Sequence, residues 1–124
     1  MTDPFGSLYV KEIVFGIDRA TQRIHHVAGT GKKGYSQEGG APKTALFRGP
    51  KGLVIDDEGR ILLVDTENHA VRRIDLVKKT VVTVLGERAA KNQTTLKRPH
   101  GIDYSPEFGF MVGDSENHRV LLAK

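Results

Sequence analysis

The chain of 124 residues contains no cysteine and no tryptophan, and only 6% of its residues are aromatic. The absence of cysteine excludes disulfides, thiol redox chemistry and zinc sites built on thiolates. The sequence has no run of about 18 apolar residues, and its N-terminus has no basic segment followed by an apolar one. We therefore expect one domain with no signal peptide, no membrane contact and, by default, a cytoplasmic location.

Positive charge is concentrated in two stretches of the chain. The whole chain has a net charge of +4, whereas residues 30–51 alone sum to +4 and residues 87–98 to +3, so the remainder is net negative. A concentrated positive field attracts acidic peptides, polyanions and phosphorylated ligands. The position of these two stretches in the fold is therefore relevant to function.

The hexapeptide GTGKKG at residues 29–34 has the glycine spacing of a dinucleotide-binding loop. Such a loop needs a helix directly after it and an acidic residue about 20 positions further on. Here Gly39, Gly40 and Pro42 interrupt any helical pattern, which leaves room for a single helical turn in PKTALF at most. The sequence therefore favours a connecting turn over a nucleotide site.

An internal repeat determines the predicted fold. Residues 50–71 and 99–120 align without a gap at an offset of 49 positions, and a third, degenerate copy precedes them. The complete unit contains four short stretches typical of β-strands: GLVID, RILLVD, AVRRID and TVVTVLG. Units of four antiparallel strands at this period are typical of β-propeller blades.

The predicted fold is therefore all-β, a β-propeller sector of four-stranded antiparallel blades. We divide its single domain into an incomplete first blade (1–29), a connector (30–49), a complete blade (50–86), a second connector (87–98) and an incomplete last blade (99–124). These blades supply three, four and three strands. Because bare strand edges invite pairing, we expect completion of the ring by a second copy in a homodimer or by the remainder of a longer propeller.

Three segments resemble the NHL repeat family: VAGTGKKGYSQEGGAPKTALF, GPKGLVIDDEGRILLVDTENHAVRRID and RPHGIDYSPEFGFMVGDSENHRV. The resemblance covers nearly the whole chain and implies a propeller of about six blades, of which two copies of this chain would close one ring. It also implies that GTGKKG joins the outer strand of one blade to the inner strand of the next. Some members of the family bind RNA through a positive face. Single-stranded RNA is therefore one implied ligand, although the connectors offer only Tyr35 and Phe47 for base stacking.

The connectors of a propeller emerge on one face, so we expect the two basic stretches to share one rim of the central channel. We predict that this face binds a protein or an anionic ligand. The residues predicted to present the positive charge are Lys32, Lys33, Lys51, Arg98 and His100. The chain is accordingly interpreted as a binding module rather than an enzyme.

Four polar residues recur at matched positions between the second and third strands of two blades: Asp65, Asn68, Asp114 and Asn117. Such a recurrence can indicate a metal site. Short polar side chains at turns also form hydrogen bonds with their own backbone, and we interpret all four as structural turn residues.

The alternative function is a metal-dependent lyase or lactonase-like hydrolase with its site in the channel. Peptidyl-hydroxyglycine lyases, which resemble this family, hold zinc with histidines in Pro-His-Gly segments, and only His100 matches that pattern. Gluconolactonase-like propellers use acidic and amide residues in the channel, for which only Asp103 is available. Since catalytic zinc needs three protein ligands, we predict no catalytic residues and no cofactor, and we keep His100 and Asp103 as candidate ligands for zinc or calcium.

Overall fold

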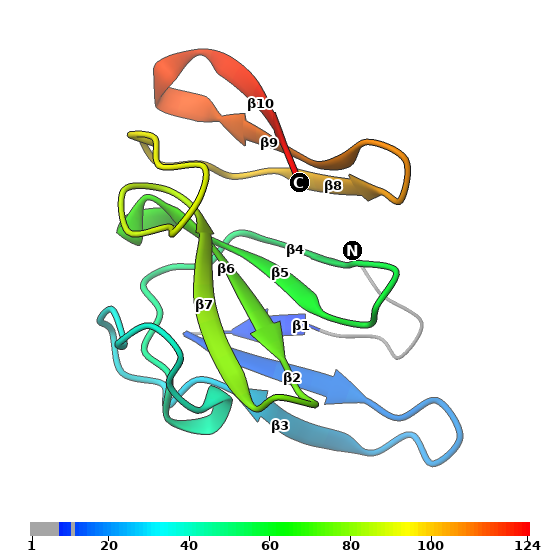
Figure 1. Cartoon of the computed structure of the whole chain (residues 1–124). Coiled ribbons are helices and arrows are strands. Elements are labelled where there is room, and N and C mark those ends of the chain that lie inside the picture. Colours follow the sequence, from blue (N-terminus) through cyan, green and yellow to red (C-terminus); the bar gives the residue numbers. More distant parts are fainter. Residues whose placement is uncertain (1–7, 11) are drawn as a thin grey trace.

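The computed structural model describes residues 8–10 and 12–124, with side chains described from residue 12 onwards. Within this range the chain forms three antiparallel sheets of three, four and three strands, as the repeat predicted (Figure 1). Three short 3-10 turns are the only helical elements of the described residues: η1 (Pro42–Thr44), η2 (Thr66–Asn68) and η3 (Ser115–Asn117). None of the described helices is long and apolar enough to cross a membrane.

Each sheet is built from strands that are consecutive in the sequence. The first sheet contains β1 (Leu8–Val10), β2 (Ile13–Ile17) and β3 (Ile24–Ala28). The middle sheet contains β4 (Gly52–Ile55), β5 (Ile61–Asp65), β6 (Ala70–Asp75) and β7 (Thr80–Leu85). The last sheet contains β8 (Ile102–Ser105), β9 (Gly109–Asp114) and β10 (Arg119–Ala123). The all-β antiparallel architecture is therefore confirmed.

The strand register follows the internal repeat. In the middle sheet Asp65 pairs with Ala70, and in the last sheet Asp114 pairs with Arg119, at the same offset of 49 positions. The GTGKKG segment lies in the loop between β3 and β4, and η1 in the PKTALF segment is the only helical turn described there. Gly29 has a φ of +91°, and a Cβ at this position would lie 2.2 Å from the carbonyl oxygen of Glu12, so the tight exit from β3 requires glycine.

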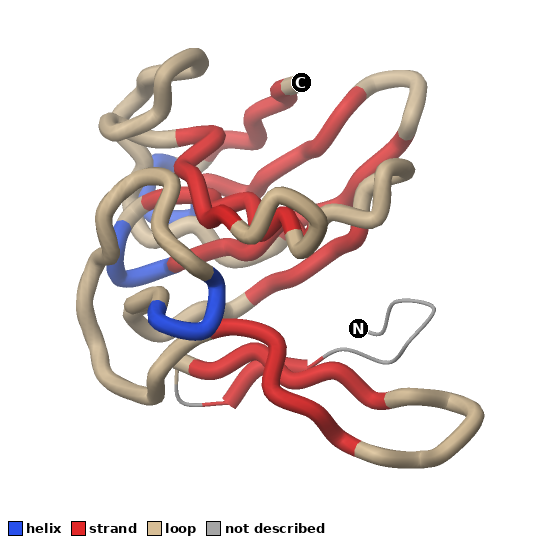
Figure 2. The backbone as a smooth tube through the Cα atoms, turned by 60° about the horizontal axis from the view of Figure 1, so that its bottom comes forward, coloured by secondary structure: helices blue, strands red, loops and turns tan. Residues whose placement is uncertain are grey.

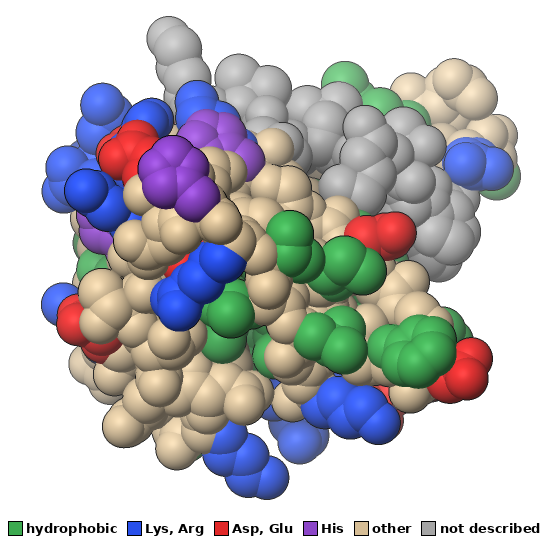
Figure 3. All heavy atoms as spheres, turned by 90° about the horizontal axis from the view of Figure 1, so that it is seen from above, with side chains coloured by type: hydrophobic (Ala, Val, Ile, Leu, Met, Phe, Trp, Pro, Cys, Tyr) green, Lys and Arg blue, Asp and Glu red, His purple; other side chains and the backbone are tan. Residues whose placement is uncertain are grey.

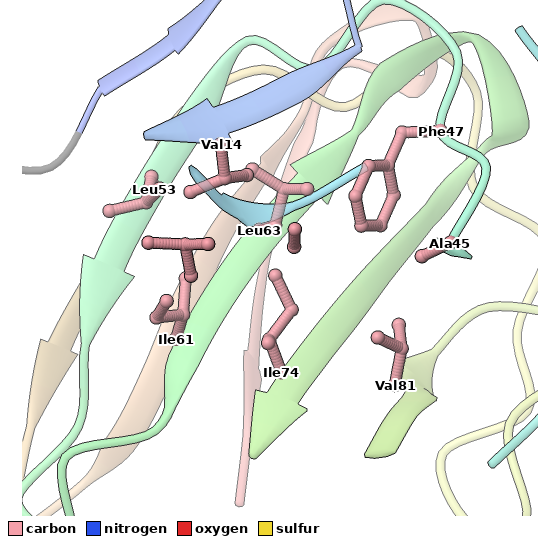
Figure 4. Packing of buried hydrophobic residues seen from close by; sticks show 10 residues of the cluster. Val14, Ala45, Phe47, Leu53, Ile61, Leu63, Ile74 and Val81 are labelled. Carbon is pink, nitrogen blue, oxygen red and sulfur yellow. The ribbon is translucent and has the colours of Figure 1, made fainter. Parts of the chain in front are cut away.

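The middle sheet is covered on both faces, and alternate residues of its strands therefore point into two different cores. Leu53 and Leu63 belong to the core shared with the first sheet, whereas Val54 and Leu62 belong to the core shared with the last sheet. Figure 4 shows the first of these cores, where Phe47 from the connector packs beside side chains of both sheets. Burial on both faces explains why strands β4 and β5 are almost entirely apolar.

The first connector also covers the outer edge of the middle sheet. The N–H of Gly39 donates to the carbonyl of Val81 at 2.8 Å, and the N–H of Val81 donates to the carbonyl of Gly40 at 2.8 Å. The carboxylate of Glu38 accepts hydrogen bonds from the N–H of Thr83 at 2.5 Å and from its hydroxyl at 2.8 Å. Strand β7 is therefore protected from pairing with another chain, by a contact that the sequence did not predict.

Candidate functional site

Each connector is held by hydrogen bonds to the aspartate turn of the blade that follows it in the sequence. The carboxylate of Asp65 accepts from the N–H of Arg48 at 2.7 Å, and that of Asp114 accepts from the N–H of Lys97 at 2.7 Å. The turns that follow these aspartates bind the same two connector residues through their backbone. These carboxylates thus hold the preceding connector, whereas the sequence had suggested bonds to the backbone of the turn itself.

The two asparagines of these turns repeat the same role. The amide of Asn68 donates to the carbonyl of Gly34 at 2.7 Å, and that of Asn117 donates to the carbonyl of Thr95 at 3.2 Å. Both amides also bind the aspartate of their own turn at 2.9 Å. Both connectors are consequently held at the same end of the sheets, where Figure 2 shows the loops and the 3-10 turns gathered together. We call this end, made of residues 30–49, 65–69, 87–98 and 114–118, the connector face.

Arg98 bridges the turns of neighbouring blades. Its guanidinium donates to Glu67 at 2.8 and 2.9 Å and to Glu116 at 2.8 Å, while its backbone N–H donates to Nδ1 of His69 at 3.0 Å. Hydrogen bonding to Arg98 holds the pKa of both glutamates below the usual value, and the same bonds raise the pKa of Arg98. The charge of this predicted binding residue is therefore largely engaged by two carboxylates of the protein.

The glutamate partners of Arg98 were not identified from the sequence. Glu67 and Glu116 lie in the turns, outside the basic stretches, and therefore did not enter the charge count of the connectors. Their matched positions in the repeat were the available signal, because residues 49 positions apart lie at the same end of adjacent blades.

The predicted lysines remain at the surface. Lys32 and Lys33 are exposed on the first connector, and Lys51 is exposed close enough to Glu67 to contribute to its lowered pKa. Figure 3 shows Lys, Arg and His side chains gathered on one side of the molecule, with a few acidic ones among them. The predicted role of these lysines in ligand binding stays a prediction.

His100 and Asp103, the predicted metal candidates, have only local hydrogen bonds. Nδ1 of His100 lies 2.9 Å from the carbonyl oxygen of Arg98, so this nitrogen carries the proton and donates. Asp103 is exposed in β8, where its carboxylate accepts from the N–H of Tyr104 at 2.8 Å. Among the described residues, no group of three His, Asp or Glu side chains is arranged to hold a metal ion. The enzyme alternative gains no support from this region.

A hollow of about 480 Å³ lies on the connector face between the two connectors. Tyr35, Arg88, His69 and Lys97 contribute to its lining. The guanidinium carbon of Arg88 lies 3.9 Å from the centroid of the Tyr35 ring. Burial raises the pKa of the Tyr35 hydroxyl, which forms a hydrogen bond with the hydroxyl of Thr83. The sequence offered no sign of this hollow, because Tyr35 and Arg88 are brought together only by the docking of both connectors.

A buried ion pair lies beneath the hollow. Arg72 and Asp65 have fully buried side chains, and Nη1 of Arg72 donates to the aspartate at 3.3 Å. The guanidinium also donates to the carbonyl of Ser36 at 3.3 Å and lies 4.2 Å from the Tyr35 ring centroid, but its Nε has no hydrogen-bond partner. Burial raises the pKa of Asp65, against the opposing effect of the N–H of Arg48.

The matched aspartate of the last blade is in a different environment. Asp114 pairs at 2.8 Å with Arg119, whose side chain is 41% exposed. Burial acts to raise the pKa of Asp114, but hydrogen bonds from the N–H of Lys97, from Asn117 and from Arg119 outweigh it and lower this pKa. Two aspartates at equivalent positions of the repeat thus have pKa values shifted in opposite directions.

Comparison with known proteins identifies both the repeat and the fold. Residues 47–74 match the NHL repeat family. A stretch of 62 residues is 42% identical to Protein SUPPRESSOR OF QUENCHING 1, chloroplastic, of Arabidopsis thaliana, and this stretch makes up 50% of the present chain and 6% of the plant protein.

Two solved structures from Bacteroides species have the same fold. A protein of unknown function from Bacteroides thetaiotaomicron superimposes with a TM-score of 0.74 and 22% identity, over 89% of this chain and 29% of the other. An auxiliary nutrient binding protein from Bacteroides ovatus superimposes with a TM-score of 0.70 and 22% identity, over 92% of this chain and 33% of the other. The chain therefore spans about a third of the length of these two structures.

Proposed function

We propose that the chain, which belongs to the NHL repeat family and has the fold of part of an NHL propeller, is a binding module whose connector face takes an acidic peptide segment. One observation carries this proposal: the two basic connectors are docked side by side, and the nearby carboxylates are already engaged within the protein. Glu67 and Glu116 bind Arg98, and Glu38 binds Thr83. Each connector, residues 30–49 and 87–98, has a net charge of +3, and together they exceed the charge of −4 of the two aspartates and two glutamates of the turns.

An acidic peptide fits this surface better than single-stranded RNA does. Sequence-tolerant RNA binding depends on aromatic side chains on which bases stack. Phe47 is fully buried in the core, and the Tyr35 ring is covered by the guanidinium groups of Arg72 and Arg88. The connector face thus offers charge without a free stacking platform, which favours a ligand recognised through its carboxylates.

The test measures binding of a fluorescent poly-glutamate peptide by anisotropy over a series of salt concentrations. We expect affinity that falls as salt is raised, and a loss of about tenfold or more when Lys32→Glu and Lys33→Glu are combined. Lys78→Glu with Lys79→Glu is the matched control, because these neighbouring lysines carry the same charge in the turn at the opposite end of β6. Equal losses in both double variants, or binding independent of salt, would overturn the proposal.

Exposed apolar side chains on the outer face of the last sheet favour a second function, which is self-association into a closed ring. Val120 of β10 is 64% exposed, whereas the matched Val71 of β6 is fully buried against the last sheet. Met111 and Leu122 pair across β9 and β10 and are also exposed. Figure 3 shows hydrophobic side chains gathered on the side away from the basic cluster. A following blade would bury these side chains as the last blade buries those of the middle one.

The first sheet has the complementary open face. Ile17 and Ile24 pair across β2 and β3, and Ile24 is exposed. Two copies arranged head to tail would place the last sheet of each against the first sheet of the other, which closes a ring with two equivalent contacts. Light scattering over a dilution series tests this arrangement. A dimer that dissociates in Val120→Asp but persists in Val77→Asp, an exposed control in the β6–β7 turn, is the expected result. A monomer at every concentration would contradict it.

A further inference from the structure

The entry to the last blade is held by a hydrogen bond that has a counterpart at the entry to the middle blade. Nδ1 of His69 accepts from the backbone N–H of Arg98 at 3.0 Å. Oε1 of Glu12 accepts from the backbone N–H of Gly49, also at 3.0 Å. Arg98 and Gly49 are 49 positions apart, and each directly precedes the proline that begins its repeat unit. His69 and Glu12 both have the left-handed backbone conformation, with φ of 53° and 65°. The same contact between neighbouring blades is thus made once by an imidazole and once by a carboxylate.

These two acceptors respond differently to acid. An imidazole nitrogen accepts a hydrogen bond only while it carries no proton, so the proton of the neutral His69 ring lies on Nε2. A second proton would occupy Nδ1 and turn it into a donor that faces the N–H of Arg98. His69 is exposed to solvent, and histidine ordinarily changes its charge between about pH 5 and 8. The carboxyl group of Glu12 keeps an accepting oxygen whether or not it is protonated. Only the entry to the last blade therefore depends on the protonation of its acceptor.

Charged groups of the turns and of both connectors surround His69. Glu67 lies two residues before it in the same turn, and positive charge on His69 helps to lower the pKa of this glutamate. Arg98 donates to the same carboxylate. The other charged or titratable groups around this turn are Tyr35, Lys51, Glu87, Arg88, Lys97 and Glu116. The carboxylates among them favour protonation of His69, and the cations oppose it. A protonated His69 would therefore compete with Arg98 for Glu67.

We propose that His69 is a pH-sensitive latch on the connector face, which holds the second connector while its ring is neutral and releases it when the ring is protonated. Protonation removes the acceptor of the Arg98 N–H and adds a positive charge beside Glu67. Arg98 then shares that glutamate with His69, so more of the positive charge of the face is available to an acidic ligand. This effect on affinity rests on the proposed function, whereas the latch itself does not. Because the neutral ring is the docked form, the contact stabilises the fold above the histidine range and is lost as the pH falls.

Nuclear magnetic resonance of the backbone amides tests the latch without any ligand. Between about pH 8 and 5 we expect the Arg98 amide resonance to shift with the same midpoint as the His69 ring, while the Gly49 amide shows no transition with that midpoint. Solvent exchange of the Arg98 amide, corrected for its intrinsic dependence on pH, should become about 2- to 10-fold faster on protonation, as expected for the loss of one hydrogen bond. Because this measurement uses the unmodified protein, it does not depend on the folding of a variant.

The matched variant is His69→Gln, because glutamine has the length of the Glu12 side chain, keeps an accepting oxygen and does not titrate. In this variant the Arg98 amide should lose its transition, whereas His25→Gln, at an exposed position of β3, should leave the transition unchanged. An Arg98 amide that does not follow the titration of His69 would overturn the latch. So would an Arg98 amide that titrates equally in His69→Gln.

Anisotropy with the poly-glutamate peptide tests the coupling of the latch to ligand binding. The unmodified protein and His69→Gln are compared at about pH 7.5 and about pH 5.5, so that titration of the peptide and of the other histidines cancels. On acidification we expect the affinity of the unmodified protein to rise by about twofold or more relative to that of the variant. Equal changes in both proteins would overturn the proposed regulation. An absence of binding at both pH values would refute the proposed function instead, since the amide resonances decide the latch by themselves.

Discussion

Replacing Asp65 by asparagine is expected to destabilise the protein far more than the same change at Asp114, although the two residues occupy one position of the repeat. Asparagine keeps nearly the shape of aspartate and can still accept the hydrogen bond from the connector N–H at 2.7 Å in either blade. The two substitutions therefore differ mainly in what happens to the arginine partner.

At the middle blade the substitution leaves a buried cation without its counter-ion. The Arg72 side chain is fully buried and its Nε already lacks a partner, so Ser36 and the faces of the Tyr35 and Phe47 rings remain to stabilise the charge. Removing one partner of a buried ion pair costs about 3–5 kcal/mol, because the remaining charge is desolvated and uncompensated. For a domain of this size, such a loss corresponds to a fall of roughly 10–20 °C in melting temperature.

At the last blade the partner is in contact with water. Arg119 is 41% exposed, so its guanidinium can be hydrated when the carboxylate of Asp114 is lost. Ion pairs of this kind contribute about 0–1 kcal/mol, since solvent screens them. The difference between the two variants should therefore be about 2–5 kcal/mol, which is well above the error of a denaturant titration.

Urea unfolding followed by circular dichroism measures both variants, with the combination of Asp65→Asn and Arg72→Met as the decisive control. Removing both charges should recover much of the loss, because methionine fills the space of the arginine stem without a charge. Equal losses for Asp65→Asn and Asp114→Asn would refute the reasoning. A double variant as unstable as Asp65→Asn alone would show that packing, and not the uncompensated charge, explains the loss.

Three further outcomes follow from individual contacts. Gly52→Ala should cost about 1–3 kcal/mol, because its Cβ would lie 2.5 Å from the carbonyl oxygen of His100, whereas Gly101→Ala at the matched position has no atom within 4 Å and should be nearly neutral in urea titrations. Glu38→Ala should accelerate amide exchange in β7, since it removes the acceptor of both Thr83 hydrogen bonds; unchanged exchange would show that the connector is held otherwise. The lowered pKa values of Glu67 and Glu116 mean that their ionised forms favour the folded state, so this contribution is present above about pH 4.5 and is lost on acidification. Arg98→Met should weaken that dependence on pH, and an identical pH profile would contradict the assignment.

The sequence predicted most of the fold because the repeat constrains local structure strongly. Short stretches rich in Val, Ile and Leu indicated the strands, and the match between residues 50–71 and 99–120 indicated two equivalent blades, which have equal registers in the structure. The two basic stretches were identified as connectors because they lie between the repeated units. These features depend on residues close together in the chain, whose spacing alone determines which face of a strand they occupy.

The contacts that decide the candidate site could not be predicted in the same way. The hydrogen bonds of Glu38 with Thr83 span 45 residues, and those of Arg98 with Glu67 span 31. Neither pair has a spacing that indicates proximity, and the two connectors differ in length, so the repeat does not align them. The charge count alone therefore overestimated the freedom of Arg98, which binds two glutamates from turns that the count left out.

A repeat gives two residues the same local geometry, but their energetic roles depend on what lies beyond the blade. Val71 and Val120 occupy equivalent places, yet only Val71 is removed from water, because a sheet follows the middle blade and the structure describes none after the last one. The aspartates differ for a related reason: Asp65 has a fully buried arginine partner, whereas the partner of Asp114 reaches solvent at the chain's last strand. If a further sheet covered the last blade, Val120 would gain the hydrophobic stabilisation that Val71 already has. Burial of Arg119 by such a sheet would also strengthen the desolvation that acts to raise the pKa of Asp114, against the hydrogen bonds that lower it.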